Sequence, residues 1–230
     1  MMHQFFLENP LILEKEADLA DVKEGDVVLE IGAGTGNLTR TLAERASVIA
    51  VEKDGQFIKK LKKIGNTKVV HGDALDFLKE RHDFNKVVSN IPYYISQPIL
   101  LALLKHRWDA CVLLVQKEFA EKCVSSEKLG LIVRECCDAK ICGFVSEDEF
   151  APKGIDSALL ALRQRKLLDE KFWSFLCRAF VVRNRNASKL EGCPARLAAK
   201  KIHQLTLEEL KEIYGAIKVK NLAFKSSADK

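Results

Sequence analysis

The sequence predicts an α/β fold, in which an open, mostly parallel, Rossmann-like sheet precedes a small C-terminal helical domain. Apolar, β-rich runs alternate with helix-compatible segments at about 20 to 25 residues per unit over most of the chain. Three closely spaced glycines follow the first of these runs directly. Beyond Arg165 the strand signals stop and helical patterns remain. We therefore expect two domains, 1–165 and 166–230.

Strands are expected where apolar and β-branched residues run together between turn residues. These runs are 27–31, 47–52, 68–71, 84–90, 109–116, 141–145 and 157–162. Between them, helical patterns occupy 35–44, 56–63 and 98–106, and Pro10 opens an earlier amphipathic helix. Helices are also expected at 170–182, 193–201 and 207–216. Right-handed crossovers would wind the first set into a parallel sheet.

The glycines at positions 32, 34 and 36 form a turn between the first long strand and its helix. Glycine suits such a turn because it is tight and because backbone N–H groups must approach a ligand closely. The spacing Gly-x-Gly-x-Gly differs from the Gly-x-Gly-x-x-Gly of dinucleotide-binding loops. With Glu30 in front, it resembles the first motif of class I methyltransferases that bind S-adenosylmethionine. The alternative is a glycine turn with no ligand.

Two carboxylates follow the next two strands. Glu52 lies 20 residues after Gly32, the distance at which an acid in this architecture accepts from the hydroxyls of an adenosine ribose. Asp73 ends the third strand and can accept from the exocyclic amine of an adenine. Each has a plainer interpretation, as a solvent-facing strand cap and a turn aspartate. Because these strand ends meet at one edge of the sheet, the residues could surround one cofactor.

The stretch Asn90-Ile91-Pro92-Tyr93 after the fourth strand carries the predicted chemistry. Pro92 forces Ile91 into an extended conformation and leaves the Ile91 carbonyl without an obligatory partner. The Asn90 side-chain carbonyl lies beside it, so two acceptors could hold the two N–H donors of a planar amino group. Tyr93 or Tyr94 offers a flat face on which the attached base could stack. The alternative is a strand-end turn with tyrosines in the core.

Together these stretches resemble the ribosomal RNA adenine N6-dimethyltransferase family. The resemblance rests on Glu-Ile-Gly-Ala-Gly-Thr-Gly, Gly-Asp-Ala-Leu, Asn-Ile-Pro-Tyr and the N-terminal Gln-x-Phe-Leu, in that family's order. It implies S-adenosylmethionine as cofactor and no metal. The implied cofactor residues are Gln4, Leu7, Gly32, Gly34, Gly36, Glu52, Asp73, Ala74 and Asn90, and those that receive the target adenine are Asn90, Ile91, Pro92 and Tyr93.

The resemblance also implies a substrate: two adjacent adenines near the 3′ end of small-subunit ribosomal RNA, within a pre-ribosomal small subunit. The family's basic residues ahead of Gln4 are missing, and Gly154 and Asp156 replace a usual Pro and Val, so the RNA that is bound stays open. Alternatives are a large-subunit ribosomal RNA methyltransferase, a DNA adenine or protein glutamine methyltransferase, and a ribosome-assembly or transcription factor with vestigial catalysis.

The positive charge of the chain is concentrated in its C-terminal part. The formal net charge is +5, and residues 166–230 hold 14 of the 37 Lys and Arg but only 7 of the 32 Asp and Glu. Such a surplus is typical of phosphate-backbone contact, although a solvated helix face is the simpler alternative. The expected RNA-binding residues are Arg178, Arg183, Arg185, Lys189, Arg196, Lys200 and Lys201.

Composition limits the other possibilities. No apolar run approaches the roughly 18 residues of a membrane span, and the first 20 residues do not read as a signal peptide. We therefore expect a cytoplasmic protein without a membrane partner, and a monomer by default. The seven cysteines include no Cys-x-x-Cys pair, which favours buried thiols in a reducing compartment over a zinc site.

Overall fold

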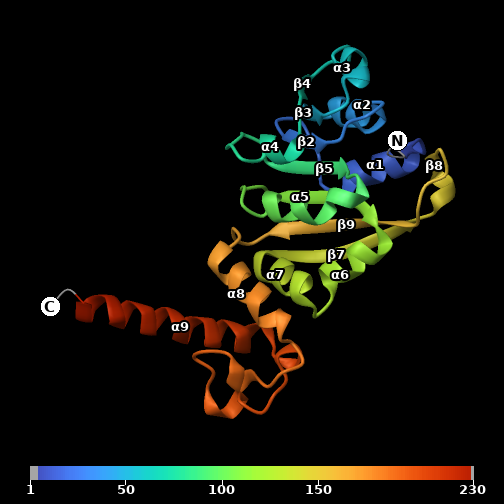
Figure 1. Cartoon of the computed structure of the whole chain (residues 1–230). Coiled ribbons are helices and arrows are strands. Elements are labelled where there is room, and N and C mark those ends of the chain that lie inside the picture. Colours follow the sequence, from blue (N-terminus) through green and yellow to red (C-terminus); the bar gives the residue numbers. More distant parts are fainter. Residues whose placement is uncertain (1–4, 229–230) are drawn as a thin grey trace.

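The computed structural model describes residues 5–228, and the side chains of residues 5–217. Its central sheet has seven strands in the order β4-β3-β2-β5-β6-β9-β7, which confirms the expected α/β fold (Figure 1). The neighbours β4 to β6 run parallel, whereas β9 is antiparallel to both β6 and β7. The strands are β2 (Val27–Ile31), β3 (Ser47–Glu52), β4 (Thr67–His71), β5 (Lys86–Asn90), β6 (Ala110–Gln116), β7 (Cys137–Val145) and β9 (Ser157–Gln164).

Both faces of the sheet are buried, so its central strands are mostly apolar. In β2, Leu29 and Ile31 join one core cluster while Val28 joins the other, as the alternation of a strand requires. One face is covered by α1 (Pro10–Leu19), α2 (Asn37–Ala43) and α3 (Gly55–Leu61). The opposite face is covered by α4 (Ala74–Phe77), α5 (Ser96–Leu103), α6 (Lys117–Val124) and α7 (Lys128–Cys136). The result is a three-layer α/β/α arrangement.

The helix pair α6 and α7 has no counterpart among the expected elements. It packs beside β7, and the two helices meet at Gly130. A Cβ built on Gly130 would lie 2.0 Å from the Ser125 carbonyl oxygen, so only glycine allows this close approach. The glycine and serines in this segment weaken its helical sequence pattern. The reason for Gly130 is its close contact with the end of α6, which the sequence pattern does not show.

The N-terminal segment is tied to a distant loop by a two-stranded sheet. Its strands are β1 (Phe6–Leu7) and β8 (Phe150–Ala151), which pair antiparallel. Helix α1 follows at once, with Asn9 as N-cap accepting from the Leu11 N–H at 3.0 Å and Pro10 in the first turn. This arrangement holds α1 and the start of the described chain against the carboxyl end of the main sheet.

Beyond β9 the chain is helical, with α8 (Glu170–Val181) and α9 (Leu207–Ala228). The helix expected at 193–201 is wrong: only the short 3₁₀ turn Ala195–Leu197 forms there. The chain instead folds back on itself, with an antiparallel bridge between Asn186 and Lys201, and so buries Leu197 and Ile202. A continuous helix would extend the segment and expose part of this apolar surface.

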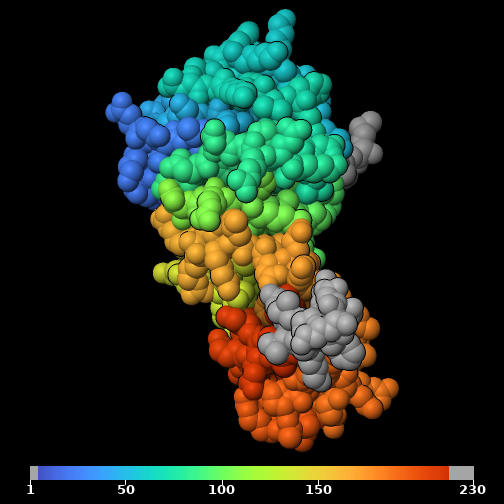
Figure 2. All heavy atoms as spheres, turned by 90° about the vertical axis from the view of Figure 1, so that its left-hand side faces the viewer, coloured from blue at the N-terminus to red at the C-terminus, as the bar shows by residue number. Residues whose placement is uncertain are grey.

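Figure 2 shows the C-terminal part, coloured orange to red, as a narrower lobe beside the larger sheet-containing body. The core does not break between them, since Phe172, Phe175 and Leu176 of α8 belong to the same cluster as Leu129 and Ile132 of α7. The domain boundary near residue 165 therefore stays a prediction. Among the described residues, no helix is both long and apolar enough to cross a membrane.

Candidate functional site

The predicted site residues lie at the carboxyl ends of four adjacent parallel strands. Gly32 follows β2, Glu52 ends β3, Asp73 comes two residues after β4, and Asn90 ends β5. In an open α/β sheet this edge is where ligands bind. Gln4, the first of the expected cofactor residues, lies outside the described residues.

The glycine turn requires glycine for two reasons. Gly32, Gly34 and Gly36 have φ of 74°, 49° and 79°, the left-handed region that other residues rarely adopt. The turn is also crowded, because a Cβ on Gly34 would lie 2.9 Å from a ring carbon of Phe6. A Cβ on Gly32 would lie 3.4 Å from Pro92 Cδ and 3.9 Å from the Asn90 carbonyl oxygen, so the turn and the Asn-Ile-Pro-Tyr stretch are in contact.

Glu52 is held rigidly at the end of β3. Its Oε2 accepts from the Gly34 N–H at 2.7 Å, and its Oε1 accepts from the Asp54 N–H at 2.6 Å. These bonds fix the carboxylate beside the glycine turn while leaving further lone pairs for a ligand hydroxyl. The side chain is buried.

Asp73 is the N-cap of the short helix α4 and precedes Ala74, which is almost fully buried. One carboxylate oxygen accepts from the Leu75 N–H at 2.8 Å, and the other pairs with Lys53 Nζ at 3.0 Å. The hydrogen bond from Lys53 is the main reason that the pKa of Asp73 is lowered, and the hydrogen bond from the Leu75 N–H is the second. Asp73 therefore stays ionised and able to accept at neutral pH.

The Asn90 to Tyr93 segment leaves β5 and enters a 3₁₀ turn, Tyr93–Ile95. The Ile91 N–H extends the ladder by donating to the Leu114 carbonyl at 3.2 Å, which fixes the buried Ile91 in place. No donor among the described residues bonds to the Ile91 carbonyl oxygen. A backbone acceptor is thus available directly beside the Asn90 side chain.

The Asn90 amide faces the buried carboxylate of Glu16 from α1. We assign the amide with its nitrogen toward Glu16, where it lies 2.8 Å from Oε1 and 3.2 Å from Oε2, because an ionised carboxylate offers only acceptors and the opposite assignment would place oxygen against oxygen. The amide oxygen then points away from Glu16.

Tyr93 is fixed by both its ring and its hydroxyl. The ring stacks on Phe5 with centroids 6.3 Å apart and an interplanar angle of 27°, and the hydroxyl lies 2.8 Å from Ser157 Oγ. Burial raises the pKa of the Tyr93 hydroxyl, so it remains neutral. The neighbouring Tyr94 is 60% exposed and free to contact a ligand.

Another buried acid, Glu30, lies on β2, the strand that pairs with β5. Burial is the largest cause that raises the pKa of Glu30 to about 8, and the charge of Glu52 adds to it, whereas the Thr39 hydroxyl acts in the opposite direction. Its Oε2 has no hydrogen-bond partner among the described residues. Because ionising a buried carboxyl group costs free energy, Glu30 is mostly protonated at neutral pH.

Leu7 is also buried near the glycine turn, and its carbonyl accepts from Asn37 Nδ2 of α2 at 3.0 Å. Sequence reasoning missed Glu16, Phe5 and Ser157 as parts of this site. One signal for Glu16 exists in the sequence: it occupies a position on the buried stripe of α1, where an apolar residue is normal. The other two come from distant segments and carry no local signal.

The seven expected RNA-binding side chains are all exposed on the C-terminal part. Arg196 pairs with Glu212, Lys200 with Glu209 at 2.6 Å, and Arg183 with Glu127 at 3.8 Å. Within the described side chains, the other four form no ion pair, and these are Arg178, Arg185, Lys189 and Lys201. Unpaired cations are the ones available to a phosphate.

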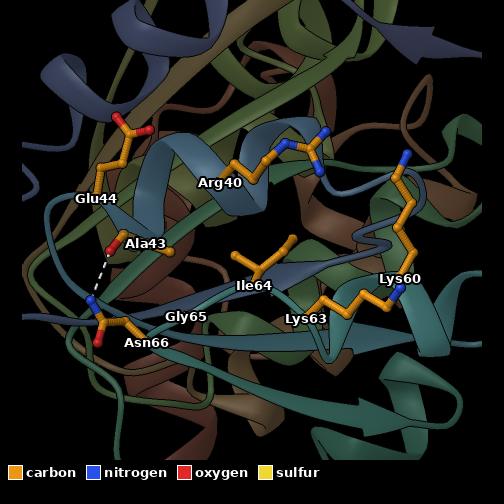
Figure 3. Close-up of a pocket in the computed structure, with 8 residues that line it drawn as sticks. All are labelled: Arg40, Ala43, Glu44, Lys60, Lys63, Ile64, Gly65 and Asn66. Carbon is orange, nitrogen blue, oxygen red and sulfur yellow. Dashed lines mark hydrogen bonds between the residues drawn. The ribbon is translucent and has the colours of Figure 1, made fainter.

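A cavity of about 430 Å³ lies elsewhere, between α2, α3 and the turn before β4 (Figure 3). It is found at the C-terminal end of α2, whereas the glycine turn precedes the other end of that helix. None of the predicted site residues lines it. The lining residues are Arg40, Ala43, Glu44, Lys60, Lys63, Ile64, Gly65 and Asn66.

Comparison with known proteins agrees with this geometry. A relative from Thermococcus sibiricus, named a probable ribosomal RNA small subunit methyltransferase A, is 44% identical over 118 residues, which are 50% of this chain and 42% of the relative. The ribosomal RNA small subunit methyltransferase A of Clostridium botulinum is 38% identical over 160 residues, or 62% of this chain and 58% of that protein. The chain thus spans about half the length of the curated relatives it matches.

Solved structures extend the likeness to nearly the whole chain. A dimethyladenosine transferase from Plasmodium falciparum has a TM-score of 0.80 and 26% identity, covering 90% of this chain and 95% of that one. The 23S rRNA methyltransferase ErmE has a TM-score of 0.69 at 23% identity, with 93% and 99% covered, and so shares the fold. The family described as ribosomal RNA adenine dimethylase matches residues 2–228. The chain therefore belongs to the ribosomal RNA adenine dimethylase family.

Proposed function

We propose that this protein uses S-adenosylmethionine to methylate N6 of adenines in ribosomal RNA, and that it dimethylates two adjacent adenines near the 3′ end of small-subunit RNA. Family membership and the names of the relatives support this reaction. The observation that supports it most is the close approach of Gly32 to Pro92 and to the Asn90 carbonyl, because a cofactor bound on the glycine turn would then lie next to the two proposed acceptors. The small-subunit names make large-subunit RNA the less favoured substrate.

The residues present fit S-adenosylmethionine. The carboxylate of Glu52, fixed by two backbone N–H groups, suits the ribose hydroxyls, and the ionised Asp73 beside Ala74 suits the adenine amine. The glycine turn and Leu7 would border the methionine part. When bound, the cofactor supplies a methyl group that its sulfonium has already activated. The protein then needs neither a metal nor a strong base, only positioning and the exclusion of water.

The target adenine must leave its stack to reach this edge of the sheet. We assign the amide oxygen of Asn90 and the carbonyl of Ile91 as acceptors for the two N–H groups of its amine. They would direct the nitrogen lone pair at the methyl group while the base stacks on Tyr93. One N–H remains after the first transfer and none after the second. The loss of both hydrogen bonds favours release of dimethyladenine.

The C-terminal cations supply the sequence-independent part of RNA binding in this proposal. The expected setting is a monomer acting on a pre-ribosomal small subunit in the cytoplasm. A ribosome-assembly factor with vestigial catalysis is the competing function, since the same basic surface would serve it.

The test is methyl transfer from labelled S-adenosylmethionine to unmethylated small and large ribosomal subunits in parallel. We expect label in small-subunit RNA alone, found as N6-dimethyladenosine at two neighbouring positions. Label in the large subunit would replace the proposed substrate. Binding to the small subunit without any transfer would support the assembly factor instead.

A further inference from the structure

Glu16 is an acidic residue on the buried face of α1, where apolar residues are normal. It lies on the buried side of α1 with Leu13 and Ala17, and its side chain is 1% exposed. The neighbouring acids of α1, Glu14 and Asp18, instead point outward. Within the described residues, Glu16 has no cationic partner. Because burying such a carboxylate lowers stability, its presence calls for a functional reason.

The partner of Glu16 is the residue on which the proposed reaction depends. With the Asn90 amide assigned so that its nitrogen faces α1, that nitrogen lies 2.8 and 3.2 Å from the two carboxylate oxygens of Glu16, which is hydrogen-bonding distance. The nitrogen and oxygen of a side-chain amide lie in one plane, on opposite sides of the Cβ–Cγ bond. A hydrogen bond from the nitrogen to Glu16 therefore turns the amide oxygen away from α1. The orientation of the Asn90 amide is thus fixed by Glu16, which lies outside the proposed substrate pocket.

The charge state of Glu16 decides which way the amide turns. An ionised carboxylate can only accept, so it selects the Asn90 nitrogen, whereas a protonated one can donate to the oxygen and reverse the amide. Burial first, and then the charge of Glu30 on β2, raise the pKa of Glu16 well above its ordinary value. Arg45 engages Glu14 and Asp18 on the outer side of α1, and Glu30 is the charged group that acts on Glu16 from the sheet.

We propose that Glu16 is a positioning residue, whose ionised carboxylate holds the Asn90 amide so that its oxygen accepts an N–H of the target amine. The inference rests on the proposed function, in which Asn90 receives the adenine. It adds that the acceptor side of the amide is set from α1, and that transfer is lost as pH falls through the raised pKa of Glu16.

Two substitutions separate this role from a packing role. Glu16→Gln keeps an oxygen that can accept from Asn90, so we expect kcat within about threefold of wild type at pH values where Glu16 is ionised, and no loss of activity as the pH falls through the pKa of Glu16. Glu16→Leu keeps the bulk but no acceptor, so kcat should fall about tenfold or more while the cofactor Kd stays the same. Glu14→Gln, on the outer side of α1, is the control and should match wild type.

The proposal is overturned if Glu16→Leu keeps the wild-type kcat, or if Glu16→Gln loses as much as Glu16→Leu. If the wild-type protein methylates no RNA, only the proposed function is refuted. The Glu16 contact is then tested by a measurement that needs no catalysis. The Asn90 side-chain amide is followed by NMR in ¹⁵N-asparagine-labelled protein, with Asn90→Ser giving the assignment. We expect its resonances to titrate with pH in wild type but not in Glu16→Gln, and to move in Glu16→Leu. Identical, non-titrating resonances in all three proteins would contradict the Glu16 contact.

Discussion

The buried Glu30 should make the protein less stable as pH rises, and Glu30→Gln should remove that dependence. The pKa of Glu30 is raised from 4.5 to about 8, mainly by burial. The unfolded chain therefore gives up this proton at lower pH than the folded protein does, and stability falls between these two values. Each pH unit in that window lowers the free energy of unfolding by about 1.4 kcal/mol.

The size of the effect follows from the shift. At pH 7 the substitution should raise the free energy of unfolding by about 3 kcal/mol, and at pH 8 and above by up to about 5 kcal/mol. Near pH 4.5 the two proteins should differ little, because Glu30 is then protonated in the folded protein and still half protonated in the unfolded chain. Glutamine keeps the size of the side chain and a group that can face the Thr39 hydroxyl.

Urea unfolding followed by circular dichroism, at unit steps from pH 5 to pH 9, measures this difference directly. Glu121→Gln, at an exposed position of α6, is the control and should show no such dependence. A Glu30→Gln difference that stays constant from pH 5 to pH 8 would refute the reasoning, because it would mean that Glu30 is ionised in the folded protein throughout.

Two further predictions concern the glycine turn and the basic surface. Gly34→Ala should abolish cofactor binding and cost about 1 to 3 kcal/mol of stability in a thermal melt, because φ is positive there and the new Cβ would meet Phe6; Gly65→Ala, with no atom within 4 Å, should do neither. Lys189→Ala with Lys201→Ala should lower the salt dependence of RNA binding by about two units of log–log slope. Lys200→Ala should change it less, since Lys200 is already paired with an acid, and equal effects would contradict a role for unpaired cations.

The strands of the sheet were predicted well because each one has a recognisable pattern within its own stretch of sequence. The runs 27–31 and 47–52 coincide with β2 and β3, since both are short, mostly apolar and β-branched runs that are largely buried. The failures have tertiary causes. Helix α7 depends on Gly130 fitting against α6, and the segment around Leu197 folds back to bury its apolar side chains. Neither contact leaves a periodic pattern along the chain.

The site divides in the same way. Glycine, acid and Asn-Ile-Pro-Tyr motifs follow consecutive strands, so topology alone brings them to one edge. Their roles stay predictions, whereas the family and the fold are confirmed. The sequence could not predict the residues that hold the site residues in place. Glu16 contacts Asn90 and Ser157 contacts Tyr93, and both come from elements far away in the chain.

The proposed methyl transfer depends most directly on Asn90, whose amide oxygen would accept an N–H of the target amine. The decisive measurement is single-turnover methyl transfer to unmethylated small subunits by wild type and Asn90→Ala, with S-adenosylmethionine binding measured by calorimetry on both proteins. We expect Asn90→Ala to lower the transfer rate by about 100-fold or more while its cofactor Kd stays within about threefold of wild type. Transfer at the wild-type rate by Asn90→Ala would contradict the proposed role of Asn90.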